Sequence, residues 1–243
     1  NGGGVDRLLY DYCSRMIPDI QFDFIVTAEK KGILEQPLKD LGCNIYRVSQ
    51  FRKSINEHKK QIRDIIERGN YDIIHDHSGY KAFVNLKIAK KCGIKTRIAH
   101  AHQAFVAESF KSKMLRVFVT PLTKYYATNL FACGIDAGRW MWGYKTFNSG
   151  KVHIMTNAIN IPKFTFSEKT RSEMRKQLGI EGKFVVGNVA RFSYQKNHEF
   201  LLDIFMEIKH RNDNAVLLLI GGGELEDDIK AKVSEYSLND SVL

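Results

Sequence analysis

The chain has 243 residues, of which 44% are hydrophobic and 26% are charged. This composition supplies enough apolar side chains for buried cores, which excludes an intrinsically disordered protein. No apolar run is long enough to span a bilayer. Four widely spaced cysteines without a Cys-x-x-Cys pair argue against a zinc ribbon or a disulfide framework, and they fit reduced thiols in the cytoplasm.

Positive charge is concentrated in the first part of the sequence. The whole chain has 37 Lys and Arg against 27 Asp and Glu, a net charge of +10. Residues 1–162 contain 25 basic and 14 acidic side chains, whereas residues 163–243 contain 12 and 13. A basic first part predicts an anionic partner, which would be a membrane surface, a phosphorylated acceptor or nucleic acid; a merely soluble basic surface is the alternative.

Strand and helix patterns alternate along residues 1–160. Helices are expected at 5–16, 33–41, 54–68, 80–92, 109–128 and 137–142, and strands at 22–27, 44–48, 71–75, 96–99, 129–133 and 152–155. Ser54 and Glu57 form a capping box at one helix, and Pro121 is expected to interrupt another. The alternation predicts a doubly wound parallel sheet, in which ligands bind beyond the carboxyl ends of the strands.

A second α/β unit follows a linker at residues 157–166, where turn-forming residues show no helical period. Beyond the linker, helices are expected at 167–178, 197–211 and 224–236, and strands from 184 and at 216–220. We therefore expect two domains, residues 1–160 and 161–243. The sequence starts without Met and stops in what resembles a new strand, so we expect truncation at both ends and an incomplete second domain.

The stretch 184–198, FVVGNVARFSYQKNH, joins an apolar strand to a helix through a loop with two cations, Arg191 and Lys196. Asn197 can cap the helix. A helix N-terminus offers free N–H groups and a positive dipole, and the cations add charge-assisted hydrogen bonds, so the stretch predicts a diphosphate site. The alternative is an ordinary junction with two solvated cations.

Three glycines, Gly2, Gly3 and Gly4, precede the first helix. Glycines in this position let the backbone approach a ligand closely, especially a phosphate. The alternative is a flexible end of the chain, and on these residues alone both interpretations stay open.

Four histidines, His75, His77, His100 and His102, lie near the ends of two expected strands, together with Asp76. They could ligate a metal, face a cleft and handle protons or sugar hydroxyls, or be polar loop residues satisfied by the backbone. We expect His102, and to a lesser degree His77, to face a cleft and His75 and His100 to point back into packing. A metal site is disfavoured because alternate strand residues point to opposite faces.

Residues 105–126 combine apolar residues with four cations, Lys111, Lys113, Arg116 and Lys124. An apolar stripe beside cations can lie in a membrane interface. It can equally be a core helix with a solvated face.

Further patterns recur in order along nearly the whole chain: GGGVD at 2–6, YDIIHDH at 71–77, IAHAH at 98–102, FAC at 131–133, AGRW at 137–140, NAIN at 157–160, VAR with QKNH at 189–198, and IGGG at 220–223. In order and spacing they resemble the retaining family 4 glycosyltransferases, whose GT-B fold has two facing Rossmann-like domains. The resemblance is closest to bacterial enzymes of capsule and exopolysaccharide assembly. Ala158, Asn160 and Ala190 depart from the usual residues.

The resemblance implies metal-independent transfer of a sugar from a nucleotide sugar, UDP-linked, to a lipid-linked polysaccharide acceptor, without a cofactor. Arg191 and Lys196 would hold the diphosphate, and Gly2, Gly3 and Gly4 would approach the phosphates or the sugar. His102 would act in catalysis and His77 would lie on the acceptor side. The first domain would be the acceptor side and the second would bind the nucleotide sugar. The protein would be cytoplasmic and peripheral at the inner face of the membrane.

Two other functions stay open. A UDP-sugar 2-epimerase shares the two-domain fold but would need catalytic carboxylates and a histidine in the cleft, and the loop with Arg191 and the Gln-Lys-Asn run argues against it. A non-catalytic nucleotide-binding module would need only the anion loop. We expect no nucleic-acid binding, because no known binding motif and no face with interleaved aromatics and cations is present.

Overall fold

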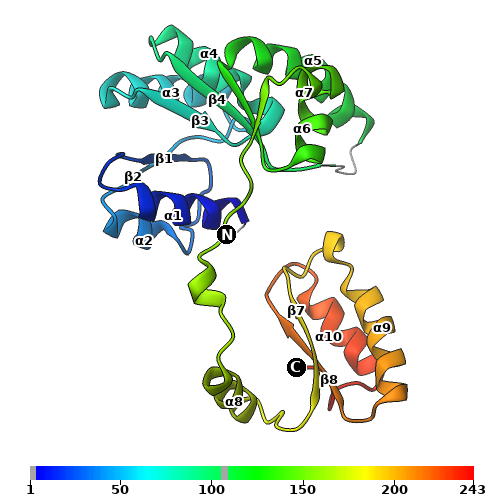
Figure 1. Ribbon diagram of the computed structural model, residues 1–243. Helices are drawn as coiled ribbons and strands as arrows, with labels where there is room; N and C mark the ends of the chain where they lie inside the picture. The colour runs from blue at the N-terminus through cyan, green and yellow to red at the C-terminus, as the bar shows by residue number, and fades with distance from the viewer. Residues whose placement is uncertain (1–3, 105–108) are drawn as a thin grey trace. The chain divides into compact units, whose positions relative to one another are not determined.

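The computed structural model of the chain describes residues 4–104 and 109–243 (Figure 1). The structure divides into two compact units, Asn1–Ile161 and Pro162–Leu243, and the boundary lies one residue beyond the expected position. Every named strand pair in the described residues is parallel, which confirms the predicted α/β class.

The first unit alternates strands and helices along the chain, as its hydrophobic pattern predicts. Its strands are β1 (Asp23–Val26), β2 (Asn44–Arg47), β3 (Ile73–Asp76), β4 (Thr96–Ala101), β5 (Asn129–Ala132) and β6 (Val152–Ile154). Its helices are α1 (Gly4–Met16), α2 (Glu35–Asp40), α3 (Ile55–Gly69), α4 (Phe83–Lys91), α5 (Phe110–Tyr126), α6 (Ile135–Trp142) and α7 (Tyr144–Asn148), and 3₁₀ turns form at η1 (Gly79–Ala82) and, at the unit boundary, η2 (Ile161–Phe164).

The strands of the first unit do not form the single sheet that the sequence predicts. The six strands form a two-stranded sheet, β1-β2, and a four-stranded sheet in the order β3-β4-β5-β6. Side chains connect the two sheets instead of a backbone ladder, since the Tyr71 hydroxyl donates to Asp23 Oδ2 at 2.6 Å and Ile25 packs with Ile74 against one core cluster.

Three apolar clusters of described residues hold the first unit together, one of them between α1, α2 and the two-stranded sheet, and the other two lie against the four-stranded sheet. Of these two, the first joins α3 to α4, and the second joins α4 and α6 to the central strands β4 and β5. Trp142 is buried in the second cluster and its indole Nε1 donates to Phe131 O at 2.9 Å. At the start of α3 the Ser54 hydroxyl accepts from the Glu57 N–H, which confirms the predicted N-cap. Figure 1 shows α3, α4 and α5 in succession along one side of this sheet.

Helix α5 differs from its prediction in two ways. It continues through Pro121, which ends no helix here although it removes one backbone donor. Its buried side chains are Thr120 and Thr123, and Thr123 Oγ1 donates to Tyr80 O at 2.6 Å. The apolar side chains are exposed instead, with Phe110 at 78% and Phe118 at 68%. Within the first unit, this segment therefore does not form the alternative of a core helix with a solvated polar face.

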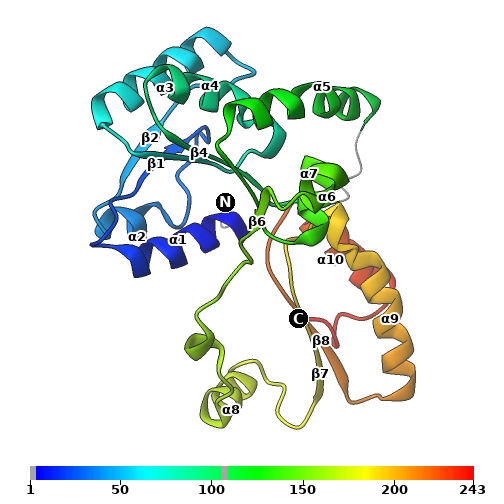
Figure 2. The same ribbon diagram turned by 45° about the horizontal axis from the view of Figure 1, so that its top comes forward.

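The second unit contains α8 (Glu168–Gln177), β7 (Phe184–Val189), η3 (Tyr194–Lys196), α9 (His198–Arg211), β8 (Ala215–Ile220) and α10 (Glu226–Glu235). β7 and β8 pair in parallel from Phe184↔Ala215 to Val189↔Ile220, and a parallel bridge follows at Leu217↔Val242. α9 and α10 lie side by side (Figures 1 and 2). Their buried faces form one core with β8, because Phe205, Leu217 and Ile229 belong to the same apolar cluster.

Candidate functional site

The four histidines of the first unit gather at the carboxyl ends of β3 and β4. His75 lies on β3 and His100 on β4, and His77 and His102 follow the same strands. Residues two apart on a strand point to the same face, so each pair presents both of its rings on one side. The prediction that strand alternation keeps these side chains apart is therefore wrong, because alternation separates neighbouring residues and not residues two apart.

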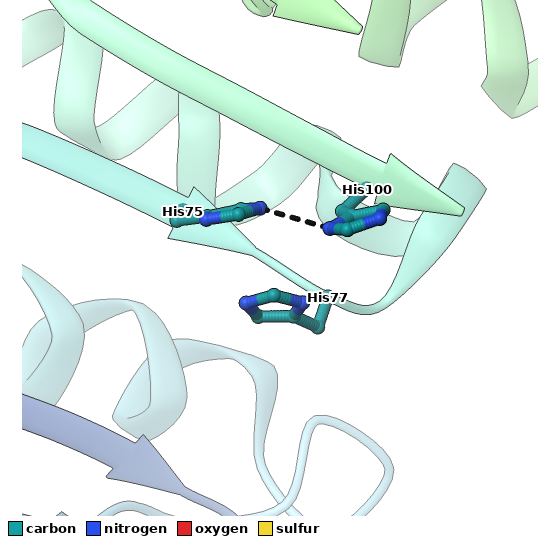
Figure 3. A group of neighbouring side chains, drawn as sticks. All are labelled: His75, His77 and His100. Atoms are coloured by element: carbon teal, nitrogen blue, oxygen red, sulfur yellow. Dashed lines mark hydrogen bonds between the residues drawn. The ribbon is translucent and has the colours of Figure 1, made fainter. Parts of the chain in front are cut away.

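Contacts between ring nitrogens join the two strands. His75 Nε2 lies 3.1 Å from His100 Nδ1, and His77 Nδ1 lies 2.8 Å from His102 Nε2. Along each strand the rings lie close together, with His75 and His77 stacked at a centroid distance of 4.1 Å and His100 and His102 tilted at 4.0 Å. Figure 3 shows His75 and His100 on adjacent strands with His77 beside them. His75 and His100 are thus packed as expected, but they pack within one imidazole cluster.

The cluster is closed on one side by an aromatic ring and is poor in polar partners. The Phe131 ring meets His75 and His100 edge to face, at centroid distances of 5.7 and 5.8 Å. Two buried nitrogens, His100 Nε2 and His102 Nδ1, have no hydrogen-bond partner within residues 4–104 and 109–243. His100 is completely buried.

Burial keeps the imidazoles neutral. Burial, and to a smaller extent the neighbouring imidazoles, lowers the pKa of His75 to about 4, of His77 to about 2 and of His100 to about 3. Burial lowers the pKa of His102 as well. A neutral imidazole offers one N–H and one lone pair, so each ring can both donate and accept.

Asp76 does not join the cluster, although it stands between His75 and His77 in the sequence. Its Oδ1 accepts from the Ser78 N–H at 2.8 Å, and its Oδ2 accepts from Asn85 Nδ2 at 2.8 Å. The Asn85 amide oxygen in turn lies 3.1 Å from His58 Nε2. Asp76 therefore fixes the turn after β3 and the start of α4 rather than serving the imidazoles.

In the second unit Arg191 follows β7 and is already paired. Its Nη2 donates to Glu224 Oε2 at 2.9 Å, and both side chains are more than half exposed. Glu224 stands just after the glycines at 221–223, and its pKa is lowered by its own backbone N–H and by Arg191. Glu224 was not predicted as a site residue from the sequence. The one feature that could have indicated it is its position directly after a glycine-rich turn.

Close backbone approach explains the glycines that bring these two loops together. A Cβ on Gly221 would lie 1.9 Å from Ala190 O, and one on Gly223 would lie 2.2 Å from Phe192 O. Backbone hydrogen bonds fill that space, from Ala190 N to Ile220 O at 3.0 Å and from Phe192 N to Gly222 O at 3.2 Å. Only glycine leaves room for the loop after β8 to hold the loop that carries Arg191.

The helix start beside this loop is not capped as expected. Asn197 occupies the N-cap position of α9, but it is in the left-handed conformation with φ 47° and its side chain makes no capping hydrogen bond. Its amide oxygen therefore does not occupy the N–H groups of the first turn, where an anion is favoured. Lys196, exposed just before the helix, adds a positive charge at the same end.

Of the three glycines predicted to approach the donor, only Gly4 belongs to the described residues. Gly4 is the first residue of α1, and Asp6 stands in the first turn of that helix. Gly2 and Gly3 lie outside the described residues. The structure thus gathers His77 with His102 in one unit and Arg191 with Lys196 on one loop of the other.

Comparison with known proteins identifies relatives of both units. Residues 170–243 match the family model described as Glycosyl transferases group 1. The whole chain is similar to "Putative glycosyltransferase EpsF" of Bacillus subtilis, with 27% identity over 65% of that protein. It is also 21% identical to the capsular polysaccharide biosynthesis glycosyltransferase CapH of Staphylococcus aureus, over 66% of its length. The chain thus spans slightly less than two thirds of these relatives.

Solved structures share the fold. The Anabaena protein HepE, crystallised with UDP, superposes on the whole chain with a TM-score of 0.75 at 19% identity, and the chain covers 65% of it. A glycosyltransferase from Rickettsia africae gives a TM-score of 0.73 at 16% identity, with 64% of it covered. This likeness confirms the predicted fold class, in which α/β units with parallel sheets are of the GT-B type.

Proposed function

We propose, from the match of residues 170–243 to the group 1 glycosyl transferases, that the chain is part of an enzyme that moves a sugar from a nucleotide sugar to a growing polysaccharide. The observation that carries the proposal is the loop between β7 and α9. This loop lies within the matched segment and presents Arg191 and Lys196 beside a helix start without a side-chain cap. Such an arrangement suits a diphosphate.

UDP is the nucleotide that we propose for the donor. The Anabaena relative has been crystallised with UDP and with UDP-glucose, and this supports a UDP-sugar here. The name of the relative CapH supports a polysaccharide product. We propose that the acceptor is lipid-linked, and that the reaction retains the configuration of the anomeric carbon.

Arg191 would bind the donor by exchanging its partner. In the structure the guanidinium is held by the Glu224 carboxylate, an anion at a hydrogen-bonding distance of 2.9 Å. A diphosphate carries more charge and more acceptor oxygens, so it would displace the carboxylate. Lys196 would contact the same diphosphate, and the two cations together would stabilise the departing UDP. We propose that this charge stabilisation needs no metal ion.

The histidines of the first unit would serve the sugars. We propose that His102 acts on the donor sugar or its transition state, and that His77 lies toward the acceptor. Their ring nitrogens are 2.8 Å apart, so a proton between them can be donated in either direction. Gly2, Gly3 and Gly4 would let the backbone before α1 approach the phosphates or the transferred sugar.

A membrane surface is the partner that we propose for α5, and it would place the enzyme at the inner face of the cell membrane. Large apolar side chains of this helix are exposed, among them Phe110 and Phe118, and Lys111 and Lys113 stand beside them. Apolar anchors next to cations suit an anionic lipid interface. Among the described residues no helix is both long and apolar enough to cross a bilayer.

Binding of UDP to the full-length protein tests the donor assignment. We expect Arg191→Ala and Lys196→Ala to weaken UDP binding roughly tenfold or more, because each removes a charge-assisted hydrogen bond. Lys169→Ala is the matched control, since this lysine is exposed on α8 outside the loop. Glu224→Gln should strengthen UDP binding, because it removes the carboxylate that competes for Arg191. Unchanged affinity in Arg191→Ala would refute the diphosphate assignment.

Product analysis separates the transferase from its alternatives. A transferase releases UDP only when an acceptor glycan is present, whereas a UDP-sugar 2-epimerase converts the donor without one. A non-catalytic module binds UDP and forms neither product. Metal independence predicts full activity in EDTA, and loss of activity that Mn²⁺ restores would contradict it.

Vesicle sedimentation tests the membrane contact. Wild-type protein should bind vesicles with anionic lipid more strongly than neutral ones, and a Phe110→Ser, Phe118→Ser double variant should lose most of this binding. Tyr194→Ser is the control, because Tyr194 is an aromatic side chain that is 91% exposed on the second unit. Equal binding by the double variant and the control would exclude α5 as the contact.

A further inference from the structure

The imidazole cluster at the ends of β3 and β4 contains more ligating nitrogens than its own hydrogen bonds use. Each of His75, His77 and His100 offers a ring nitrogen, and these nitrogens all lie within 4.8 Å of one another (Figure 3). His100 is completely buried, yet its Nε2 has no hydrogen-bond partner within residues 4–104 and 109–243. A buried polar atom without a partner is costly, and this nitrogen is not the one that His100 uses toward His75, so the ring keeps hydrogen-bonding capacity that the cluster does not use.

One pair of ring nitrogens has nearly the spacing that a small tetrahedral ion needs. Zinc–nitrogen bonds of about 2.0–2.1 Å at tetrahedral angles place two ligand nitrogens about 3.3 Å apart. His75 Nε2 and His100 Nδ1 are 3.1 Å apart across the two strands. An ion at this pair would replace the hydrogen bond between the two rings, and the His77 ring nitrogen, which lies within 4.8 Å of the others, would have to move closer to complete the site.

The kind of ligand selects the kind of ion. The three ligating groups are imidazoles, which suit zinc, copper, nickel and iron. Magnesium and calcium need oxygen ligands, and the nearest carboxylate in the sequence, Asp76, is committed to Ser78 and Asn85. The cluster would therefore discriminate against the hard divalent cations.

We propose that His75, His77 and His100 form a binding site for one transition-metal ion of the zinc type, with a fourth position left to His102 or to solvent. Three protein ligands with a fourth open position is a common zinc arrangement. All of its ligands belong to the first unit, and none of them is on the diphosphate loop of the second. Binding would take His77 away from its partner His102, so metal occupancy would interfere with any role of these two rings in sugar transfer.

Metal binding to the full-length protein, freed of metal with a chelator, tests the proposal directly. We expect isothermal titration with Zn²⁺ to give one site per chain, and Co²⁺ to give the visible absorption of a tetrahedral centre. His75→Ala and His77→Ala should each weaken Zn²⁺ binding at least about tenfold. Mg²⁺ should not compete for the site.

His153→Ala is the matched control. His153 lies exposed on β6 of the same sheet, and its ring meets Phe131, as do His75 and His100, but it is not part of the cluster. Wild-type affinity for Zn²⁺ in this variant would show that removing a neighbouring histidine outside the cluster does not weaken Zn²⁺ binding. Thermal unfolding without metal shows whether each variant folds. If His75→Ala does not fold, the Zn²⁺ affinity of His77→Ala decides the test, because His77 lies beyond the end of β3.

Two results would overturn the proposal: no Zn²⁺ site in the wild type, or a site that His75→Ala and His77→Ala both leave intact. Neither result bears on UDP binding by the second unit, so the metal site and the proposed transferase function fail independently.

Discussion

Replacing Gly221 with alanine should force apart the two loops that hold Arg191 and Glu224. The new Cβ would lie 1.9 Å from Ala190 O and 2.9 Å from Ala190 C, whereas ordinary contact begins at 3.4 Å. The neighbouring atoms belong to the backbone, so no side-chain rotation can relieve the clash. The φ of +156° at this position is also one that residues with a side chain rarely adopt.

The cost can be worked from the contacts that must move. A shift of more than 1 Å would break the hydrogen bonds from Ala190 N to Ile220 O and from Phe192 N to Gly222 O. Each bond contributes about 1 kcal/mol, and overpacking against a fixed backbone costs roughly 1–3 kcal/mol. We expect Gly221→Ala to destabilise the second unit by about 3–5 kcal/mol. At about 4–8 °C per kcal/mol for a domain of this size, the smaller figure lowers the Tm by roughly 12–24 °C.

Gly222→Ala is the control within the same turn. The nearest atom to its added Cβ would be Glu226 Oε2 at 3.7 Å, an ordinary contact. This variant should stay within about 0.5 kcal/mol of the wild type. Thermal unfolding followed by circular dichroism measures both. Equal Tm values for the two alanine variants would refute the argument from close backbone approach.

Three further predictions concern stability. His198 is buried and its pKa is lowered, mainly by burial, so its contribution to the stability of the folded state is complete above pH 6.5 and is lost as the pH falls. His198→Gln should therefore flatten the decline in Tm of the second unit between pH 7 and 5. An unchanged slope of Tm against pH would contradict this. Tyr71→Phe removes the 2.6 Å hydrogen bond to Asp23 and should lower the free energy of unfolding by about 1.5–3 kcal/mol, whereas a change below 0.5 kcal/mol would show that the link between the two sheets is unimportant. Ser54→Ala should cost about 1 kcal/mol by uncapping α3, and Ser54→Asp should restore it, with urea unfolding as the measurement.

Local patterns predicted the elements because the information for them lies within a few residues. The helix at 55–69 follows from Ser54 and an apolar stripe, and β8 follows from a continuous apolar run. The number of sheets was not predictable in this way. Whether β1 and β2 join the other strands depends on contacts between distant residues, such as Tyr71 with Asp23, which no periodicity encodes.

The candidate site was predictable to the same degree. The cations Arg191 and Lys196 could be placed on a loop before a helix, but the partner of Arg191 comes from the turn after the next strand, 33 residues further on. The grouping of His75 with His77 could have been foreseen, since residues two apart share a face of a strand. The contact of that pair with His100 and His102 required knowledge that β3 and β4 are neighbours.

The exposed face of α5 separates solubility from stability in the first unit. Phe110 and Phe118 contribute little to folding because they are mostly in solvent, and the buried side of the helix is anchored through Thr123. Polar replacements at these two positions should therefore reduce aggregation of the purified protein and leave its Tm unchanged. Because this face is exposed, substitutions on it cost little stability. Related sequences can therefore differ here, and the composition of the face can match the surface that each protein binds.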